Sequence, residues 1–454
     1  MKPITFLKFI FISATAGLLS MCQQKKEKED QSLRGSRPNI ILVNTDDQGK
    51  GDLSCLGNPD LETPNLDSLY SMSTRFTDFH VSPASSPTRA AIMSGRHEFK
   101  VGVTHTCGER ERLSLPTTTI AEVLQEAGYE TGIFGKWHLG DEEEYQPNNR
   151  GFNEVFIHGG GLIGRWSNGS CADYPPNKEN DRKNGYFGPV LRHNDKIVNT
   201  EGFCTDVFFR QALGWIKQKN KENQPFFAYI TPNAPHAPFY APDKYTKPFY
   251  DEGFSDDIAG RYGMIVNIDD NMGILMDKME EWYLDGNTLL IFMTDNGQYP
   301  KKGKKNGEPY QMYNAGYKSG KISPYEGGTI VPSFWHWEGV LGEGIDIDAL
   351  TAHIDLFKTF TDLAGIDIPE GVQEIDGRSM LPLLENPNAE WDDRYVFVHV
   401  GRWPKYADPN DYKYKYGYES HRGENRGGFA VRTKKWRWVN NKLYDIENDP
   451  FEKN

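Results

Sequence analysis

Short apolar runs alternate along the chain with stretches in which apolar residues have helical spacing. Four of the runs predict buried strands, at residues 39–43, 131–134, 226–230 and 289–293. Residues 119–127 place apolar side chains at helical spacing, and Gly128 follows as a helix stop. Strands that alternate with helices in this way predict an α/β domain whose sheet is largely parallel.

Polar side chains suited to acid–base or metal chemistry follow each predicted strand. They are Asp46 and Asp47, Lys136 and His138, His236, and Asp295 and Asn296. The carboxyl ends of parallel strands lie at one edge of a sheet, where α/β proteins bind their ligands. The pattern therefore predicts that these side chains form one site.

The pattern changes from Arg394 onward, where aromatic and polar residues alternate. Strands of a smaller antiparallel sheet are predicted at residues 396–400, 429–432 and 436–439. The polar and aromatic stretch 404–426 predicts a long loop over a pocket. We therefore expect a catalytic domain at 36–385 and a C-terminal subdomain at 386–454.

The first residues have the features of an export signal. Lysines precede an apolar run that is too short to cross a bilayer comfortably, so residues 1–21 predict a signal peptide. Cys22 follows a stretch similar to a bacterial lipobox, although Met21 is bulkier than the usual residue before that cysteine. We expect a polar tether at 22–35 and a periplasmic protein or an outer-membrane lipoprotein, which contacts the membrane only through Cys22.

The chain of 454 residues is acidic, which narrows the classes of partner. Its formal net charge of -13 opposes nonspecific binding to nucleic acid, so we expect no nucleic-acid partner. An anionic substrate then requires a local cluster of cations. The remaining cysteines are too widely spaced to define disulfide pairs, and we expect free thiols at Cys55, Cys107, Cys171 and Cys204.

Residues 85–89 form the most informative motif, Ser85-x-Pro87-x-Arg89. It resembles the Cys/Ser-x-Pro-x-Arg motif of type I sulfatases, in which the first residue is oxidised to formylglycine. The hydrated aldehyde offers a pair of hydroxyls on one carbon; one attacks sulfur and the other later expels sulfate. A serine at position 85 implies the radical-dependent bacterial route, with a serine-type sulfatase-maturating enzyme as partner.

Further motifs of this family occur in the expected order over nearly the whole mature chain. Asp46, Asp47, Asp295 and Asn296 match its metal-binding segments, and Ser85 completes the implied metal site. Hard oxygen ligands suit calcium or magnesium, and calcium is our first choice. The resemblance implies an alkaline-phosphatase-like fold, with a large, mainly parallel sheet between helices and a smaller C-terminal antiparallel sheet.

The resemblance also implies roles for cationic and titratable residues. Lys136, His236 and Lys321 are implied to bind the sulfate ester, and Arg89 to orient formylglycine. His138 is implied to remove a proton and thereby drive release of sulfate, whereas His236, alone or together with Lys321, is implied to protonate the departing alcohol. Cations around the sulfate would neutralise the oxygens that repel a nucleophile.

One position departs from the family pattern. After Glu326, Gly327 and Gly328, the chain has Ile330 before its Val-Pro pair, where relatives commonly have arginine. We therefore assign the supporting role of that arginine to no residue of this chain.

We expect a sulfatase that hydrolyses sulfate esters of sulfated carbohydrates and releases inorganic sulfate. One alternative is a phosphomonoester or phosphonate hydrolase with unmodified Ser85 as nucleophile, and another is a sulfated-glycan-binding protein without turnover. The pairs Arg165-Trp166 and Arg402-Trp403 offer sugar contacts, although ordinary aromatic packing is the favoured interpretation.

Overall fold

A mixed sheet of 10 strands forms the centre of the computed structural model, which describes residues 32–106, 108–163, 185–401 and 428–454. From one edge to the other, its strands are β13 (Ile345–Ile347), β2 (Thr74–Phe76), β12 (Ser333–His336), β9 (Thr288–Thr294), β1 (Asn39–Thr45), β8 (Phe226–Thr231), β4 (Glu130–Lys136), β5 (Glu154–His158), β6 (Val190–His193) and β7 (Lys196–Asn199). The consecutive strands β9, β1, β8, β4 and β5 pair in parallel. Each strand predicted from an apolar run lies in this parallel block, which confirms the predicted α/β core.

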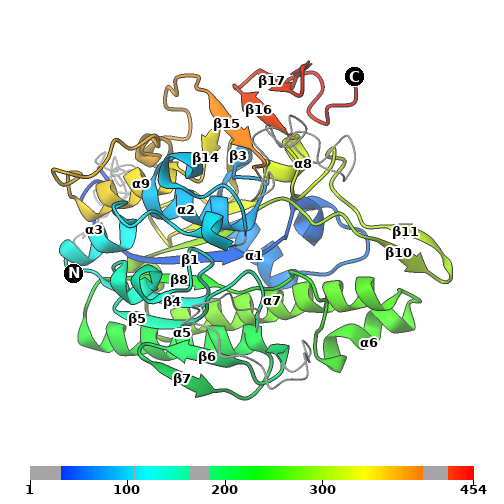
Figure 1. Ribbon diagram of the computed structural model, residues 1–454, viewed down its shortest axis with the longest axis horizontal. Coiled ribbons are helices and arrows are strands. Elements are labelled where there is room, and N and C mark those ends of the chain that lie inside the picture. The colour runs from blue at the N-terminus through cyan, green and yellow to red at the C-terminus, as the bar shows by residue number, and fades with distance from the viewer. Residues whose placement is uncertain (1–31, 107, 164–184, 402–427) are drawn as a thin grey trace, which may run out of the picture.

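Helices cover both faces of the large sheet (Figure 1). Ile40 and Leu42 of β1 face the core that includes α2 (Ser85–Ser94), α3 (Ile120–Glu126), α9 (Asp355–Ala364) and α10 (Leu381–Glu385). Ile41 and Val43 face the core that includes α1 (Pro64–Met72), α5 (Cys204–Glu222), α6 (Asp243–Asp251) and α7 (Asp256–Glu281). A strand covered on both faces is apolar at consecutive positions, which explains the continuous run in the sequence.

The helix predicted at 119–127 is α3, and side chains define where it begins. The hydroxyl of Thr119 accepts a hydrogen bond from the backbone N–H of Glu122 at 3.1 Å. The Glu122 carboxylate accepts one from the backbone N–H of Thr119 at 2.6 Å, which completes a capping box. Gly128 follows the helix with φ of 82°, a conformation that glycine adopts without strain, and the chain enters β4.

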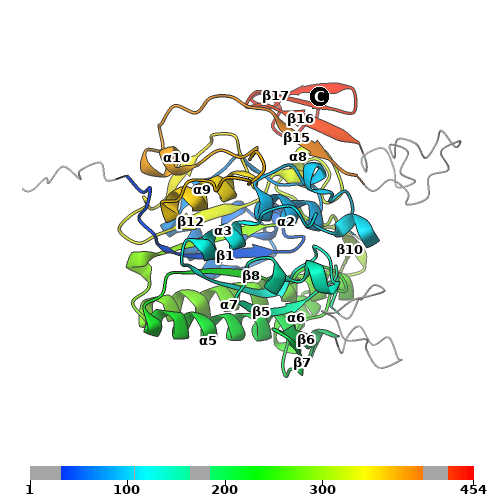
Figure 2. The same cartoon turned by 60° about the vertical axis from the view of Figure 1, so that its left-hand side comes forward.

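The C-terminal strands form a separate antiparallel sheet of four, in the order β15 (Val396–His399), β16 (Phe429–Arg432), β17 (Trp436–Val439) and β18 (Lys442–Asp445). This confirms the predicted smaller sheet and adds β18 to it. Figure 2 shows this sheet on the side of the large sheet away from α5 and α7. Next to it lies the short helix α8 (Glu326–Thr329).

Smaller strands pair outside these sheets. The pair β3 (Phe79–His80) and β14 (Thr351–Ala352) is parallel, and β10 (Lys302–Lys305) and β11 (Glu308–Gln311) form an antiparallel hairpin. The chain continues from β3 to α2, the helix that begins with Ser85.

Several sequence predictions fall outside the described residues. These are the signal peptide, most of the tether with Cys22, the loop at 404–426, both Arg-Trp pairs, Cys107 and Cys171. Cys55 and Cys204 are free thiols, as predicted. Within the described ranges, no helix combines the length and apolar character needed to cross a bilayer.

Candidate active site

The ends of β1 and β9 bring an acidic cluster together. Thr45 pairs with Thr294 at the end of this parallel ladder, so the residues that follow both strands emerge at the same edge. The backbone N–H of Asp47 donates to Asp295 Oδ1 at 3.2 Å, and Asn296 Nδ2 donates to Asp47 Oδ1 at 2.9 Å. The side chains of Asp46, Asp47, Asp295 and Asn296 are all buried, as a site at strand ends requires.

A different cation pairs with each carboxylate of this cluster. Lys136 Nζ, at the end of β4, lies 2.5 Å from Asp46 Oδ2. Lys321 Nζ lies 2.5 Å from Asp47 Oδ1, and Arg89 Nη2 lies 2.8 Å from Asp295 Oδ2. Charges this close in a poorly solvated interior interact strongly, so the pairs fix the side chains in place.

Ser85 begins α2 and lies between two nitrogen groups. Arg89 Nε donates to Ser85 Oγ at 3.0 Å, and His138 Nδ1 lies 3.2 Å from the same oxygen. Arg89 is one helical turn after Ser85, so both side chains lie on the same face of α2. Since Arg89 also pairs with Asp295, it connects the Ser85 hydroxyl to the acidic cluster.

The backbone at the site adopts conformations that L-residues seldom take. Asp47 has φ of 66° and His138 has φ of 63°, both in the left-handed region. Such conformations cost energy and persist where the surrounding structure holds them, which is common at functional sites.

His236, which follows β8, is the most accessible of the predicted site residues, with a side chain 21% exposed. Its Nε2 lies 3.7 Å from Asp47 Oδ2, and its Nδ1 lies 2.7 Å from the carbonyl oxygen of Ala237. That carbonyl accepts a hydrogen bond from Nδ1–H, so Nε2 is the nitrogen that can exchange a proton on the accessible side. The structure thus brings every predicted site residue into one cluster.

The pKa values of the carboxylates differ because their surroundings differ. Burial and repulsion by Asp295 raise the pKa of Asp46 to about 8, against the opposing effect of Lys136. Burial also acts to raise the pKa of Asp47, but Lys321 and His236 outweigh it and hold that pKa well below its usual range. Asp46 is therefore the carboxylate that most needs another cation.

Both site histidines are neutral near pH 7. Burial, reinforced by the charge of Lys136, lowers the pKa of His138 well below its usual value. Burial and the charge of Lys321 lower the pKa of His236 to about 3. A neutral imidazole has a lone pair with which it can accept a proton.

The acidic cluster has the donors that a divalent cation requires. Among the described residues, Asp46 Oδ1 and Asn296 Oδ1 are buried without a hydrogen-bond partner. Ligand atoms of Asp46, Asp47 and His236 lie within 4.8 Å of one another. Oxygen-rich sets of this kind match calcium and magnesium, and a cation here would satisfy the unpaired oxygens.

The sequence patterns missed residues that support this site. Thr231, at the end of β8, accepts a hydrogen bond from Arg89 Nη1. Arg261 in α7 donates from Nη2 to the carbonyl of Asp47 and to Asp52 Oδ2, both at 2.7 Å. An arginine buried in a long helix has no distinctive spacing, but Asp52, close after the acidic motif, was a usable signal.

Comparisons with known proteins show which family the chain resembles. The Sulfatase family model matches residues 38–366, and the model for the C-terminal part of N-sulphoglucosamine sulphohydrolase matches residues 320–454. N-acetylgalactosamine-6-sulfatase from Homo sapiens is 32% identical over 382 residues, which cover 80% of this chain and 68% of that protein. Arylsulfatase G from Homo sapiens is 31% identical over 374 residues, which cover 77% and 69%.

A solved structure is similar over a comparable length. The crystal structure of Ps i-CgsB in complex with k-i-k-neocarrahexaose has a TM-score of 0.74 and 30% sequence identity, and the match covers 92% of this chain and 88% of that chain. The family match covers most of the chain, and the human relative and the solved structure are matched over 68% and 88% of their own lengths. The chain therefore belongs to the sulfatase family and is a sulfuric ester hydrolase.

Proposed function

We propose that this sulfatase removes sulfate from a sulfated carbohydrate, with formylglycine formed from Ser85 as the nucleophile beside one divalent cation. The observation that carries the proposal is the position of Arg89, which bonds Ser85 Oγ and Asp295 Oδ2 at the same time. Residue 85 therefore lies next to a buried cluster in which Asp46 Oδ1 and Asn296 Oδ1 lack a hydrogen-bond partner and are available to bind a cation. A serine with a purely structural role would require neither the bond from Arg89 nor the carboxylate cluster beside it.

The residues around position 85 suit an oxygen nucleophile. Formylglycine, when present, supplies a hydrated aldehyde whose hydroxyls can attack sulfur and later release sulfate. Arg89 Nε orients an oxygen at this position, and His138 Nδ1 is placed to accept its proton. His138 Nε2 faces the carbonyl oxygen of Thr106 at 3.0 Å, which keeps the proton on Nε2 and the lone pair on Nδ1.

Asp46, Asp47, Asp295 and Asn296 would hold the cation together with an oxygen of residue 85. We propose calcium, with magnesium as the alternative, because calcium accepts more ligands and less regular geometry. When bound, the ion polarises oxygen and offsets negative charge on the sulfate.

Lys136, Lys321 and His236 would bind the sulfate ester. Both ammonium groups are already within the cluster, where they can neutralise anionic oxygens of the substrate. His236 presents Nε2 on the accessible side, where a departing alcohol can take a proton. Its pKa of about 3 in the free site means that the bound anion has to raise this pKa before His236 can act as an acid.

The proposed substrate class follows from relatives. The human relative is named for sulfate at position 6 of N-acetylgalactosamine, and Ps i-CgsB was solved with k-i-k-neocarrahexaose. Both names refer to carbohydrates, and both proteins match most of this chain. Together with the signal peptide proposed at 1–21 and a lipid anchor at Cys22, this supports extracytoplasmic processing of a sulfated glycan.

The test is sulfate release by protein produced with and without a serine-type sulfatase-maturating enzyme. We expect release from defined sulfated saccharides only after co-production with the maturating enzyme, and little hydrolysis of matched phosphate esters. Efficient phosphate ester turnover by protein with intact Ser85 would favour the phosphohydrolase alternative. Binding of saccharides without product, in protein verified to contain formylglycine, would indicate a glycan-binding protein.

A further inference from the structure

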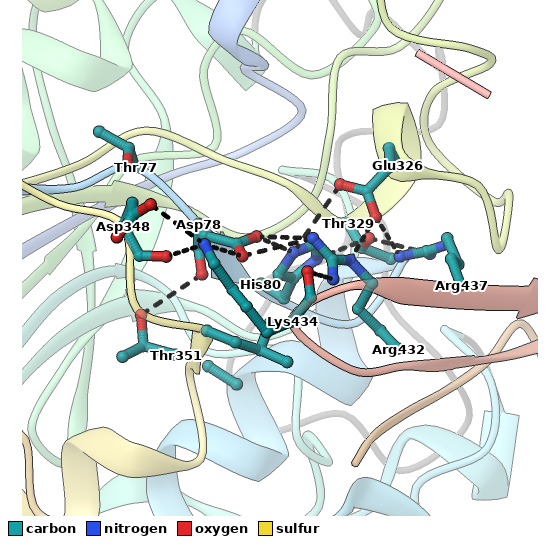
Figure 3. A network of polar contacts seen from close by, with 12 residues as sticks. Thr77, Asp78, His80, Glu326, Thr329, Asp348, Thr351, Arg432, Lys434 and Arg437 are labelled. Atoms are coloured by element: carbon teal, nitrogen blue, oxygen red, sulfur yellow. Dashed lines mark hydrogen bonds and ion pairs between the residues drawn. The ribbon is translucent and has the colours of Figure 1, made fainter. Parts of the chain in front are cut away.

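Two arginines of the C-terminal sheet are buried against α8 (Figure 3). Arg432, at the end of β16, and Arg437, in β17, have side chains 2% and 0% exposed. Arg432 Nε lies 3.0 Å and Arg437 Nη1 lies 2.7 Å from Glu326 Oε1. A carboxylate buried this deeply is stable only with such partners, so the first residue of α8 depends on the C-terminal sheet.

Arg432 also holds the segment that leads to Ser85. Its Nη2 lies 3.2 Å and 3.3 Å from the carboxylate oxygens of Asp78. His80 Nε2 lies 2.9 Å from Asp78 Oδ1, and His80 Nδ1 lies 3.1 Å from the hydroxyl of Thr329 in α8. The segment before the nucleophile and α8 therefore share one ionic network.

Arg437 holds the segment that follows Lys321. Its Nε donates to the carbonyl oxygen of Pro324 at 3.0 Å, and its Nη2 donates to Thr329 Oγ1 at 3.2 Å. Pro324 lies three residues after Lys321. One guanidinium thus bonds both to the loop that carries Lys321 and to α8, where the loop ends.

The backbone of α8 packs closely against the segment that follows Asp295 and Asn296. The N–H of Gly297 donates to the carbonyl of Gly328 at 3.0 Å. A Cβ atom added to Gly297 would lie 1.9 Å from the carbonyl oxygen of Gly327, so only glycine fits. Gly297 directly follows Asn296, and a displacement of α8 would therefore move the cation ligands.

The network itself is poorly suited to a second cation, although Asp78, His80 and Glu326 lie close enough to share one. Arg432 and Arg437 already bond Glu326, and Lys434 Nζ lies 3.3 Å from Asp78 Oδ2. Burial acts to raise the pKa of Glu326, but Arg437, His80 and Arg432 outweigh it and lower that pKa. Positive side chains thus provide the charge that a metal would bring, and, unlike Asp46 Oδ1 in the active site, no described oxygen of Asp78 or Glu326 is buried without a hydrogen-bond partner.

We propose that Arg432 and Arg437 are positioning residues for the sulfatase reaction. By holding α8, the C-terminal sheet sets the position of Lys321 and of the segment that contains Asp295 and Asn296. The proposal rests on the proposed function for its effect on turnover, but the positioning itself can be measured without turnover.

Amide hydrogen exchange tests the positioning directly. In Arg437→Met, we expect faster exchange in peptides that cover residues 295–298 and 318–329. The matched control is Arg394→Met, because Arg394 Nη1 pairs with both oxygens of Asp355 at 2.7 Å and ties the same C-terminal region to α9 instead. This control should leave those peptides protected. Unchanged exchange in Arg437→Met would overturn the proposal, whether or not the chain cleaves sulfate esters.

A double-mutant cycle tests the effect on catalysis. Arg437→Met should lower kcat/KM by about tenfold in the wild-type background and much less in the Lys321→Ala background, because it acts through Lys321. Arg394→Met should change kcat/KM by no more than about twofold while it lowers the melting temperature. Equal losses in both backgrounds would contradict positioning through Lys321, whereas a wild-type protein that is verified to contain formylglycine and releases no sulfate would contradict the proposed function.

A conservative variant covers the case in which Arg437→Met does not fold. Arg437→Lys keeps the positive charge but cannot bond Glu326, Pro324 and Thr329 together. We expect it to fold and to show the same faster exchange at 318–329. Wild-type exchange in Arg437→Lys would show that charge alone suffices and would overturn the role assigned to the guanidinium contacts.

Discussion

The Nδ1 atom of His138 lies 3.2 Å from the hydroxyl oxygen of Ser85, while the Nε2 atom faces the carbonyl oxygen of Thr106 at 3.0 Å. The carbonyl can only accept a hydrogen bond, so it selects the tautomer with the proton on Nε2. Burial keeps the ring neutral by lowering its pKa. His138 is therefore poised as a base toward residue 85.

Loss of this base should reduce turnover more than substrate binding. We expect His138→Ala to lower kcat by about 100-fold with a small change in KM, because proton transfer by a positioned group contributes on this scale. His138→Asn is the matched control for backbone strain, since asparagine tolerates the left-handed conformation at this position. If either variant keeps kcat within about twofold of wild type, the role as a base is wrong.

Replacement of His236 should make the rate depend on the leaving group. An alcohol of a sugar departs poorly without a proton, whereas an activated phenol departs without one. His236→Ala is therefore expected to slow sulfate release from sugar esters far more than from nitrophenyl sulfate. Steady-state kinetics on both ester types measure this difference. Equal losses would reject His236 as the acid and direct attention to Lys321.

Replacement of Lys136 should harm both ester types alike. Its ammonium pairs with Asp46 in a fully buried position, where it lowers the energy of negative charge whichever alcohol is leaving. Lys136→Ala is expected to reduce kcat/KM on sugar and phenyl esters by similar factors. A loss confined to one ester type would contradict a role in charge stabilisation.

Removal of a cluster carboxylate should remove the cation. We expect Asp46→Ala or Asp295→Ala to lose most of the bound metal and most of the turnover while the fold remains recognisable. Elemental analysis and circular dichroism on the same samples separate these effects. Wild-type metal content and activity in both variants would exclude the proposed metal site.

Calcium affinity should depend on pH through Asp46. Its pKa is raised to about 8 in the metal-free site, so below that pH calcium must displace a proton. Affinity is therefore expected to rise toward pH 8 and to level off above it. The metal-free fold should lose stability over the same range, because a raised pKa favours the folded state only while the proton is bound. Calorimetric titration at several pH values measures the affinity, and no pH dependence below pH 8 would contradict the assignment.

The apolar runs predicted the central strands because a strand buried on both faces must be apolar throughout. The strands outside the parallel block were less predictable. The strands β6 and β7 form an antiparallel pair with partly exposed residues, so their sequences show no continuous apolar run. The strand β12 pairs antiparallel with β9, and nothing in its four residues indicates that direction.

The site was predictable where its residues follow strands or occur within a short motif. The network around Glu326 was not, because Arg432 and Arg437 lie 106 and 111 residues away in the chain. The alternation of residues in β16 was a weaker signal of this network. Ala430 and Arg432 alternate with residues on the other face of β16, so an arginine at an inward position indicated a buried partner.

The most direct test of the central claim combines peptide mass spectrometry with sulfate release on the same preparation. Protein co-produced with a serine-type maturating enzyme is compared with Ser85→Ala made in the same host. We predict a wild-type peptide in which residue 85 has lost molecular hydrogen, with sulfate release in proportion to that modified fraction, and no release from Ser85→Ala. Full turnover by protein whose residue 85 is intact serine would contradict the account.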